Sequence, residues 1–275
     1  MGNSSIFKSY FGFTLAKNAI HGNNFECAFT LAEVLITLGI IGVVAALTMP
    51  ALIQRHNKIV WVNQLKKSVN TLENGFKMAM AEDGVENLAD TSLWQSAAIS
   101  KCQYFDPSDS RCTNFANQFK KYFNVTYNMD GSRVYTRLNH NRQTCVRTSM
   151  FINFTDGSQI YLWLRSTPGY SSGGHHSEIA TIDIDVNGVK KPDQVGRDWF
   201  QFGVTQTGQV IPYGSEAAIK LYCESTTDNS QDFSGCFSSL KSTDTWDTSS
   251  IYNCVGGYGY QCAARIMEKG WKMDY

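Results

Sequence analysis

The sequence has no excess of charge of either sign and no cysteine motif typical of zinc sites. Its 24 Lys and Arg residues are balanced by 24 Asp and Glu residues. Without a broad basic excess, the phosphate-neutralising interaction that dominates nucleic-acid binding is weak, so nucleic acid is not expected as a main partner. The chain has no CxxC motif and no His at ligand spacing from a Cys, which argues against a zinc site.

Charge is scarcest between residues 29 and 53, where Glu33 is the single charged residue. A helix of this length would extend about 37 Å, whereas crossing the apolar core of a bilayer takes roughly 20 residues. Few soluble helices are apolar on every face, so a buried helix of a globular protein is the less favoured interpretation. The pattern predicts a transmembrane helix over about residues 34–53.

Glu33 needs a partner, because an ionised carboxylate is costly inside a membrane. No Lys or Arg lies between Glu33 and Arg55. The neutralising group is then expected to be a new amino terminus made by cleavage nearby, or a charge on another subunit. Both options indicate self-assembly.

The residues from Ala28 to Glu33, AFTLAE, followed at once by the apolar run, resemble the prepilin processing motif of type IV pilins and of the pseudopilins of type II secretion. The resemblance implies cleavage between Ala28 and Phe29 by a prepilin peptidase, methylation of the new amino group of Phe29, and a role of Glu33 in assembly. Pro50 falls where the helices of this family often have a proline. Two departures are Ala28, where the family usually has Gly, and a long leader.

The resemblance further implies a leader over 1–28, a long helix over 29–83 and a globular extracytoplasmic head over 84–275. The expected fold is α+β and pilin-like, with the helix packed on an antiparallel sheet of about four strands. The expected function is that of a structural filament subunit, not an enzyme, with other subunits and the inner-membrane assembly machinery as partners. The chain would cross the inner membrane once, with its amino terminus in the cytoplasm, before assembly into a periplasmic or extracellular filament. The alternative is an extracytoplasmic binding protein or enzyme held by an uncleaved signal anchor.

Two rules disagree on the orientation in the membrane. Four basic residues follow the apolar run, namely Arg55, Lys58, Lys66 and Lys67. The positive-inside rule would therefore place the carboxyl side in the cytoplasm. The cysteines and the processing motif favour export of the head, and we give them more weight.

Hydrophobic periodicity predicts the fold of the head. From residue 54 to 81, apolar residues recur at helical spacing, which predicts a stripe that packs on a sheet: Ile59, Val62, Leu65, Val69, Leu72, Phe76 and Met80. Asp83-Gly84 should end the helix. Weak helical patterns follow over 92–100 and 113–122. Alternating residues predict a hairpin around Asp156-Gly157, with further strands over 179–186, 199–204 and 209–212.

Eight cysteines in a chain with a membrane-targeting start suggest disulfides in an oxidising compartment. Cys27 would leave with the leader, so seven remain and at least one of them, such as Cys145, is free or bonded to another chain. Spacing alone leaves the connectivity open. The simplest pairing joins sequence neighbours, which are Cys102 with Cys112, Cys223 with Cys236, and Cys254 with Cys262.

The residues Asp183, Asp185 and Asn187, followed by Gly188, match the first half of a calcium loop, in which oxygen ligands stand at every second position before a sharp turn. The twelfth position is Gln194 instead of Glu, so Asp193 or Asp198 would have to close the site. Some pseudopilins hold calcium in a late loop of the head, so the resemblance favours a calcium site here. The alternative is a strand that ends in an ordinary Asn-Gly turn.

Two further patterns are weak. The stretch from Gly169 to Gly173 fits GxSxG, but a nucleophile elbow needs a strand before it and a helix after it, and Pro168 interrupts the first. The adjacent His175 and His176 are better explained as solvated loop residues than as metal ligands. The Tyr- and Gly-rich stretch over 252–260 could present rings to a ligand, although a disulfide-closed loop packed on the head is favoured.

Overall fold

The computed structural model describes residues 30–98, 110–128, 132–139, 143–147, 151–164, 178–215, 217–218 and 253–275. The helices are α1 (Leu31–Asp83), the short 3-10 helix η1 (Leu88–Asp90), α2 (Ser92–Ala98), α3 (Ser110–Tyr122) and α6 (Cys262–Glu268). The strands are β1 (Val125–Asn128), β2 (Ser132–Thr136), β3 (Gln143–Arg147), β4 (Phe151–Phe154), β5 (Gln159–Leu164), β6 (Glu178–Asp185), β7 (Trp199–Thr205) and β8 (Val210–Pro212). The chain falls into two compact units, 1–50 and 51–275, which are described separately below.

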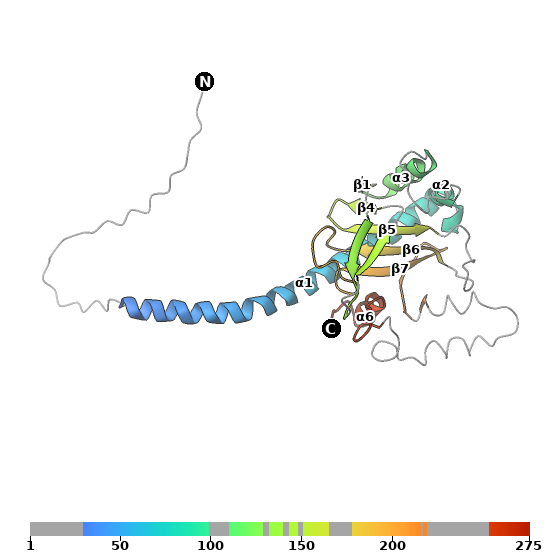
Figure 1. Cartoon of the computed structure of the whole chain (residues 1–275). Coiled ribbons are helices and arrows are strands. Elements are labelled where there is room, and N and C mark those ends of the chain that lie inside the picture. The colour runs from blue at the N-terminus through green and yellow to red at the C-terminus, as the bar shows by residue number, and fades with distance from the viewer. Residues whose placement is uncertain are drawn as a thin grey trace, which may run out of the picture. The chain divides into compact units, whose positions relative to one another are not determined.

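The head is built on a six-stranded antiparallel sheet in the order β1-β4-β5-β6-β7-β8 (Figure 1). The predicted hairpin is confirmed, with β4 and β5 joined by a turn in which Gly157 has a φ of 88°. Asp156 holds this turn by accepting a hydrogen bond from the amide of Ser158 at 3.0 Å. The strands predicted over 179–186, 199–204 and 209–212 correspond to β6, β7 and β8.

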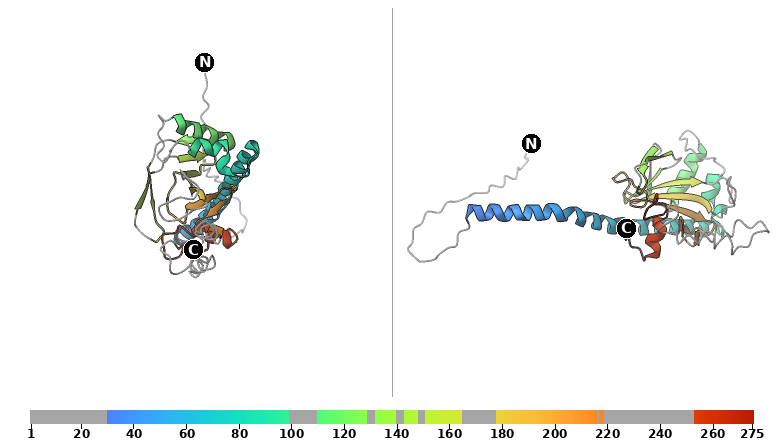
Figure 2. Two further views of the ribbon diagram at one scale, coloured as in Figure 1. Left: turned by 90° about the vertical axis from the view of Figure 1, so that its right-hand side faces the viewer. Right: turned by 60° about the horizontal axis from the view of Figure 1, so that its bottom comes forward.

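The sheet has more strands than the four or so expected, because β1 adds an edge beside β4. This strand follows the second weak helical pattern, at residues for which the sequence analysis predicted no element. The two weak helical patterns are confirmed by α2 and α3, which pack against each other (Figure 2). The strands β2 and β3 form a separate two-stranded sheet.

The second half of α1 packs on one face of the sheet. Its buried positions recur every three or four residues, so they form one face of the helix: Val62, Leu65, Ser68, Val69, Leu72, Gly75, Phe76 and Ala79. They share one apolar core with Ile160 of β5, Ile182 of β6 and Phe202 of β7. Ile59 was expected in this stripe, but its side chain is 55% exposed, so that part of the prediction was wrong.

Polar contacts fix the position of α1 against the sheet. The Nζ atom of Lys67 lies 2.9 Å from the Oδ2 atom of Asp156 in the hairpin turn. The carboxylate of Glu73 accepts a hydrogen bond of 3.1 Å from the amide of Val210 in β8. The helix ends as predicted at Asp83, where Gly84 has a φ of 65°, a conformation that glycine adopts without steric cost.

The other face of the sheet carries a second, smaller cluster made of Tyr135, Tyr161, Val195 and Trp199. The rings of Tyr135 and Trp199 have centroids 3.6 Å apart, and Tyr161 meets Trp199 edge to face at 5.9 Å. Because side chains alternate along a strand, Asp183 of β6 lies on the opposite face from Ile182 and Ile184. It is paired in register with Tyr161 and Gln201.

Candidate functional site: the first turns of α1 and the loops of the head

The first turn of α1 carries the predicted assembly residue, Glu33. Its Oε2 atom accepts hydrogen bonds from the backbone amide and from the hydroxyl of Thr30, both at 2.8 Å. The amide of Glu33 donates in turn to the Thr30 hydroxyl at 3.3 Å. This is a capping box, which satisfies donors at the start of a helix that have no partner within the helix. Thr30 therefore provides local hydrogen bonds, but as a neutral residue it leaves the charge of Glu33 uncompensated.

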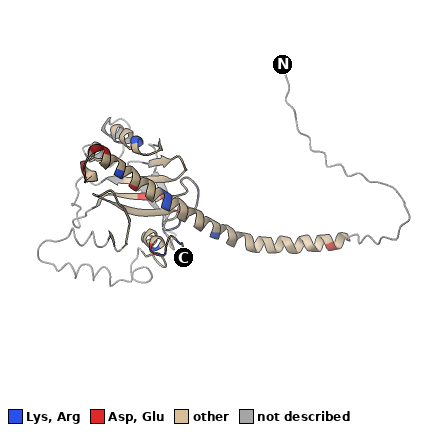
Figure 3. Cartoon of the chain, turned by 180° about the vertical axis from the view of Figure 1, so that it is seen from behind, with Lys and Arg blue, Asp and Glu red and all other residues tan. Residues whose placement is uncertain are grey.

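The side chains that follow Glu33 are apolar and exposed. Between Leu31 and Ile53 the large apolar residues point outward on every side of α1, and Leu47 is 75% exposed. In Figure 3 this stretch of α1 is tan, the colour of uncharged residues, apart from one red acidic position near its start. By length and composition α1 contains a candidate membrane span with a mean hydropathy of 2.3.

The polar groups within this stretch are satisfied inside the helix. The hydroxyl of Thr37 donates to the carbonyl of Val34 at 3.0 Å, and that of Thr48 donates to the carbonyl of Val44 at 2.9 Å. Pro50 lies within α1 and cannot donate a backbone hydrogen bond, yet the helix continues past it. A methyl group added at Gly39 or at Gly42 would meet no atom of another element within 4 Å, so the helix surface is open at both positions. The hydroxyl groups of Thr37 and Thr48 thus meet the requirement that polar groups be paired in an apolar medium.

The predicted processing residues, Ala28 and Phe29, lie outside the described residues. The same holds for Cys102, Cys223 and Cys236, for the GxSxG stretch and for the paired histidines. Only the backbone of Cys112 is described, in α3, so the structure does not test the two disulfides expected for these cysteines. Thr30 was not singled out from the sequence, although the pattern Thr-x-x-Glu before an apolar run is a helix-start signal.

The loop between β6 and β7 carries the predicted calcium ligands. Asp185 uses its Oδ1 atom to accept hydrogen bonds from the amides of Asn187 and Gly188, at 3.2 and 2.8 Å. The side-chain amide of Asn187 donates to the carbonyl of Lys191 at 3.2 Å. Asp183 is buried within β6. These contacts are those of a strand that ends in a capped Asn-Gly turn, which is the alternative to a calcium loop.

Asp198 closes the same loop from its far end. Its two carboxylate oxygens accept hydrogen bonds from the amides of Asp193 and Gln194, at 2.8 and 2.6 Å. Burial raises the pKa of Asp198 to about 6, against the lowering effect of these donors. Over the described part of the chain, which includes this whole loop, no group of three His, Cys, Asp or Glu residues could hold a metal ion. The structure does not test the calcium hypothesis, which stays a prediction.

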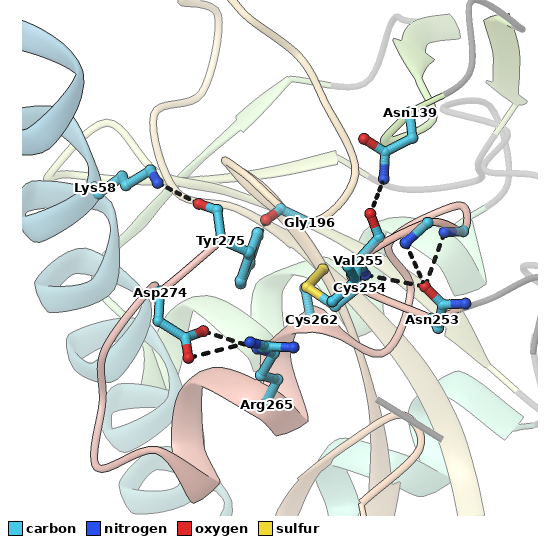
Figure 4. Close-up of a disulfide and its surroundings, with 12 residues drawn as sticks. Lys58, Asn139, Gly196, Asn253, Cys254, Val255, Cys262, Arg265, Asp274 and Tyr275 are labelled. Atoms are coloured by element: carbon cyan, nitrogen blue, oxygen red, sulfur yellow. Dashed lines mark hydrogen bonds and ion pairs between the residues drawn. A yellow bond between two sulfur atoms is a disulfide. The ribbon is translucent and has the colours of Figure 1, made fainter. Parts of the chain in front are cut away.

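The disulfide between Cys254 and Cys262 is confirmed (Figure 4). It closes a loop over residues 254–262. Asn253, just before this loop, holds its first turn, because the Oδ1 atom of Asn253 accepts hydrogen bonds from the amides of residues 255–257. Asn139 donates to the carbonyl of Val255 at 2.8 Å, and the Arg137 guanidinium lies 4.2 Å from the centre of the Tyr258 ring. The Tyr- and Gly-rich stretch is therefore a disulfide-closed loop packed on the head, as favoured from the sequence.

Comparisons with protein-family models, with curated proteins and with solved structures found no match to this chain.

Proposed function

We propose that this chain is a structural subunit of a type IV pilus or of a type II secretion pseudopilus. In this proposal a prepilin peptidase removes residues 1–28, the new amino group of Phe29 is methylated, and α1 mediates assembly into a filament from the inner membrane. One observation carries the proposal: a single helix combines an apolar, exposed first part bearing one carboxylate with a second part that packs on an antiparallel sheet.

The position of Glu33 supports a role between subunits. Its hydrogen bonds with Thr30 satisfy two acceptor sites but supply no positive charge. An ionised carboxylate at the edge of an apolar helix bundle needs a cation or a strong donor to offset the cost of leaving water. Once residues 1–28 have been removed, the amino group of Phe29 on a neighbouring subunit can supply that cation. Within the chain itself, the nearest basic residue downstream is Arg55, more than twenty positions away.

The exposed apolar surface supports a two-stage use of α1. The large side chains from Leu31 to Ile53 would be stable in a bilayer, and they would also be stable against the same segment of other subunits. Transfer from lipid into a helical bundle changes their packing partners but not the polarity of their surroundings. The same residues can therefore anchor the subunit before assembly and form the filament core afterwards.

The experiment that tests the proposal is filament assembly by a Glu33→Ala variant. In cells that provide the assembly machinery, we expect cleavage at the wild-type level but a drop in sheared filaments of about tenfold or more, since the cost arises when helices pack together. Glu86→Ala is the matched control, because Glu86 is an exposed carboxylate of the head, and it should assemble normally. Normal filaments from Glu33→Ala would refute the assembly role.

A second variant separates processing from assembly. Ala28→Glu places a bulky charged residue at the expected cleavage site, and we expect it to accumulate as the uncut chain, visible as a heavier band on a gel. Processing of this variant at the wild-type rate would place the cleavage site elsewhere.

A further inference from the structure

The residues that follow α6, from Trp271 to Tyr275, lie against the second part of α1 (Figure 4). The ammonium group of Lys58 in α1 donates a hydrogen bond to the main-chain oxygen of Tyr275. Further along α1, the Nζ atom of Lys66 lies 5.6 Å from the centre of the Trp271 ring, within range of a cation–π interaction. Two lysines of α1 thus hold the two ends of this segment.

The same segment is anchored on the head side. The guanidinium of Arg265 in α6 donates to both carboxylate oxygens of Asp274, at 2.8 and 3.1 Å, in a bidentate ion pair. The hydroxyl of Tyr275 donates to the carbonyl of Gly196 at 2.5 Å. Gly196 lies against the disulfide, since a methyl group there would meet the sulfur of Cys262 at 2.6 Å. The segment therefore links α1 to the disulfide-closed part of the head.

In the part of α1 that Lys58 belongs to, one apolar side chain, Trp61, is partly buried against the core of the head. None of residues 51–61 is buried, and Val62 is the first position of α1 whose side chain is. Pro50 removes one backbone hydrogen bond just before this stretch. Full burial on the sheet thus begins one helical turn after Lys58, and the turns before Val62 are held to the head by Trp61, which packs against the core, and by the contact of Lys58 with Tyr275.

The backbone of the segment reverses direction sharply where it leaves α6. It leaves α6 through Gly270 and Trp271, whose φ angles are 69° and 61°. Trp271 is a bulky residue in the left-handed region, which such residues adopt only when other contacts compensate. Its amide donates to the carbonyl of Ile266 at 2.8 Å, so this sharp reversal at the end of α6 is defined. The contact with Lys66 adds to this hydrogen bond and to the packing of Trp271 against the core in stabilising the conformation of Trp271.

We propose that residues 271–275 act as a latch that holds the turns of α1 from Arg55 to Trp61 to the head. When the latch opens, these turns are free to bend or unwind while the rest of the head stays folded. The latch concerns contacts within residues 51–275 only, so it stands or falls independently of the filament function proposed above.

Hydrogen exchange of the full chain in detergent micelles, read by mass spectrometry, tests the latch. In Lys58→Met the long side chain is kept but the charge is lost, and we expect the amides of residues 55–61 to exchange about tenfold faster while those of 65–79 keep their protection. Lys77→Met is the matched control, because Lys77 is an exposed lysine on the same helix, and it should behave as wild type. Unchanged exchange over 55–61 in Lys58→Met would overturn the proposal.

A second variant acts at the far end of the latch. Tyr275→Phe removes only the hydroxyl that donates to Gly196, and we expect a smaller increase in exchange over the same residues of α1. Lys58 lies in α1 and Gly196 lies in the loop before β7. Faster exchange of residues 55–61 in Tyr275→Phe would therefore show that residues 271–275 connect α1 to that loop. Faster exchange over 65–79 in either variant would mean that the head as a whole loosens, which also contradicts a latch.

Discussion

The two parts of α1 have the same secondary structure but opposite relations to their surroundings. From residue 31 to 50 the side chains are apolar on every face and exposed, whereas from Val62 to Ala79 only one face is apolar and that face is buried. A helix of the first kind favours an apolar environment, which the described residues do not supply, whereas one of the second kind has a partner within the chain, the sheet. Periodicity therefore indicates whether a helix packs within its own chain or against something outside it.

The charges of the second part sharpen the comparison. Of the four basic residues after the apolar run, Lys58 contacts Tyr275, Lys66 contacts Trp271 and Lys67 pairs with Asp156. These three lysines are used by the fold of the head. Their position after the candidate membrane span is thus explained by the head, and it does not require the carboxyl side to lie in the cytoplasm as the positive-inside rule would suggest.

The largest expected effect comes from the buried side of α1. Phe76 is fully buried and meets Trp94 and Phe123 edge to face, at 6.0 and 5.6 Å. Phe76→Ala should lower the free energy of unfolding of the head by about 3–5 kcal/mol, because it leaves a cavity. Leu38→Ala, at an exposed apolar position of the first part, should leave it unchanged. Denaturant unfolding followed by tryptophan fluorescence measures the free energy of unfolding of both variants. Equal losses of this free energy would contradict the difference between the two parts of α1.

Two glycines of the same helix provide a finer test. A methyl group at Gly75 would lie 2.0 Å from the Phe123 ring, whereas at Gly42 it would meet nothing within 4 Å. Gly75→Ala should destabilise the head by about 1–3 kcal/mol through overpacking, despite the gain in helix propensity. Gly42→Ala should not change the unfolding midpoint. An unchanged midpoint for Gly75→Ala would mean that the Phe123 ring moves aside without cost.

The loop between β6 and β7 should make the stability of the head depend on pH. Burial raises the folded-state pKa of Asp198 to about 6, above the ordinary value of 3.8. The folded state then binds the proton more tightly, so this group's stabilising contribution is complete below pH 3.8 and is lost as the pH rises through about 6. In thermal melts from pH 4 to 7, the melting temperature of the wild type should therefore include a decrease as the pH rises through about 6. Asp198→Asn should remove it, and the same profile in both proteins would contradict the assignment.

The smallest expected effect is that of calcium. Asp185 and Asp198 already accept backbone hydrogen bonds that hold the loop, so we expect calcium to raise the melting temperature only slightly above that measured with a chelator. A clear increase with calcium that disappears in the variant combining Asp183→Ala and Asp185→Ala would instead establish the calcium loop. An increase that survives in this variant would place an ion elsewhere.

Local patterns predicted α1, the hairpin of β4 and β5 and the strands β6 to β8, but they missed β1, β2, β3 and α6 as well as the long-range contacts. The end of α1 at Asp83 and the hairpin turn at Gly157 follow from residues adjacent in the sequence. The short edge strand β1 was missed because four residues carry too little periodicity. The contact of Lys58 with Tyr275 joins residues 217 positions apart, which no local pattern could indicate.

The same reasoning explains the outcome at the candidate site. The carboxylate of Glu33 and the apolar run could be interpreted from the sequence because a charge without a partner stands out among apolar neighbours. The function of the loop after β6 could not be interpreted from the sequence, because alternating aspartates fit both a calcium loop and a capped turn. Only the hydrogen bonds from the amides of Asn187 and Gly188 to Asp185 favour the turn.

The mass of the amino-terminal peptide of the mature protein tests the central claim most directly. The filament account predicts a peptide that begins at Phe29 and is heavier than the unmodified peptide by one methyl group. A mature chain that begins at Met1 would contradict it and would favour a protein held in the membrane by an uncleaved signal anchor.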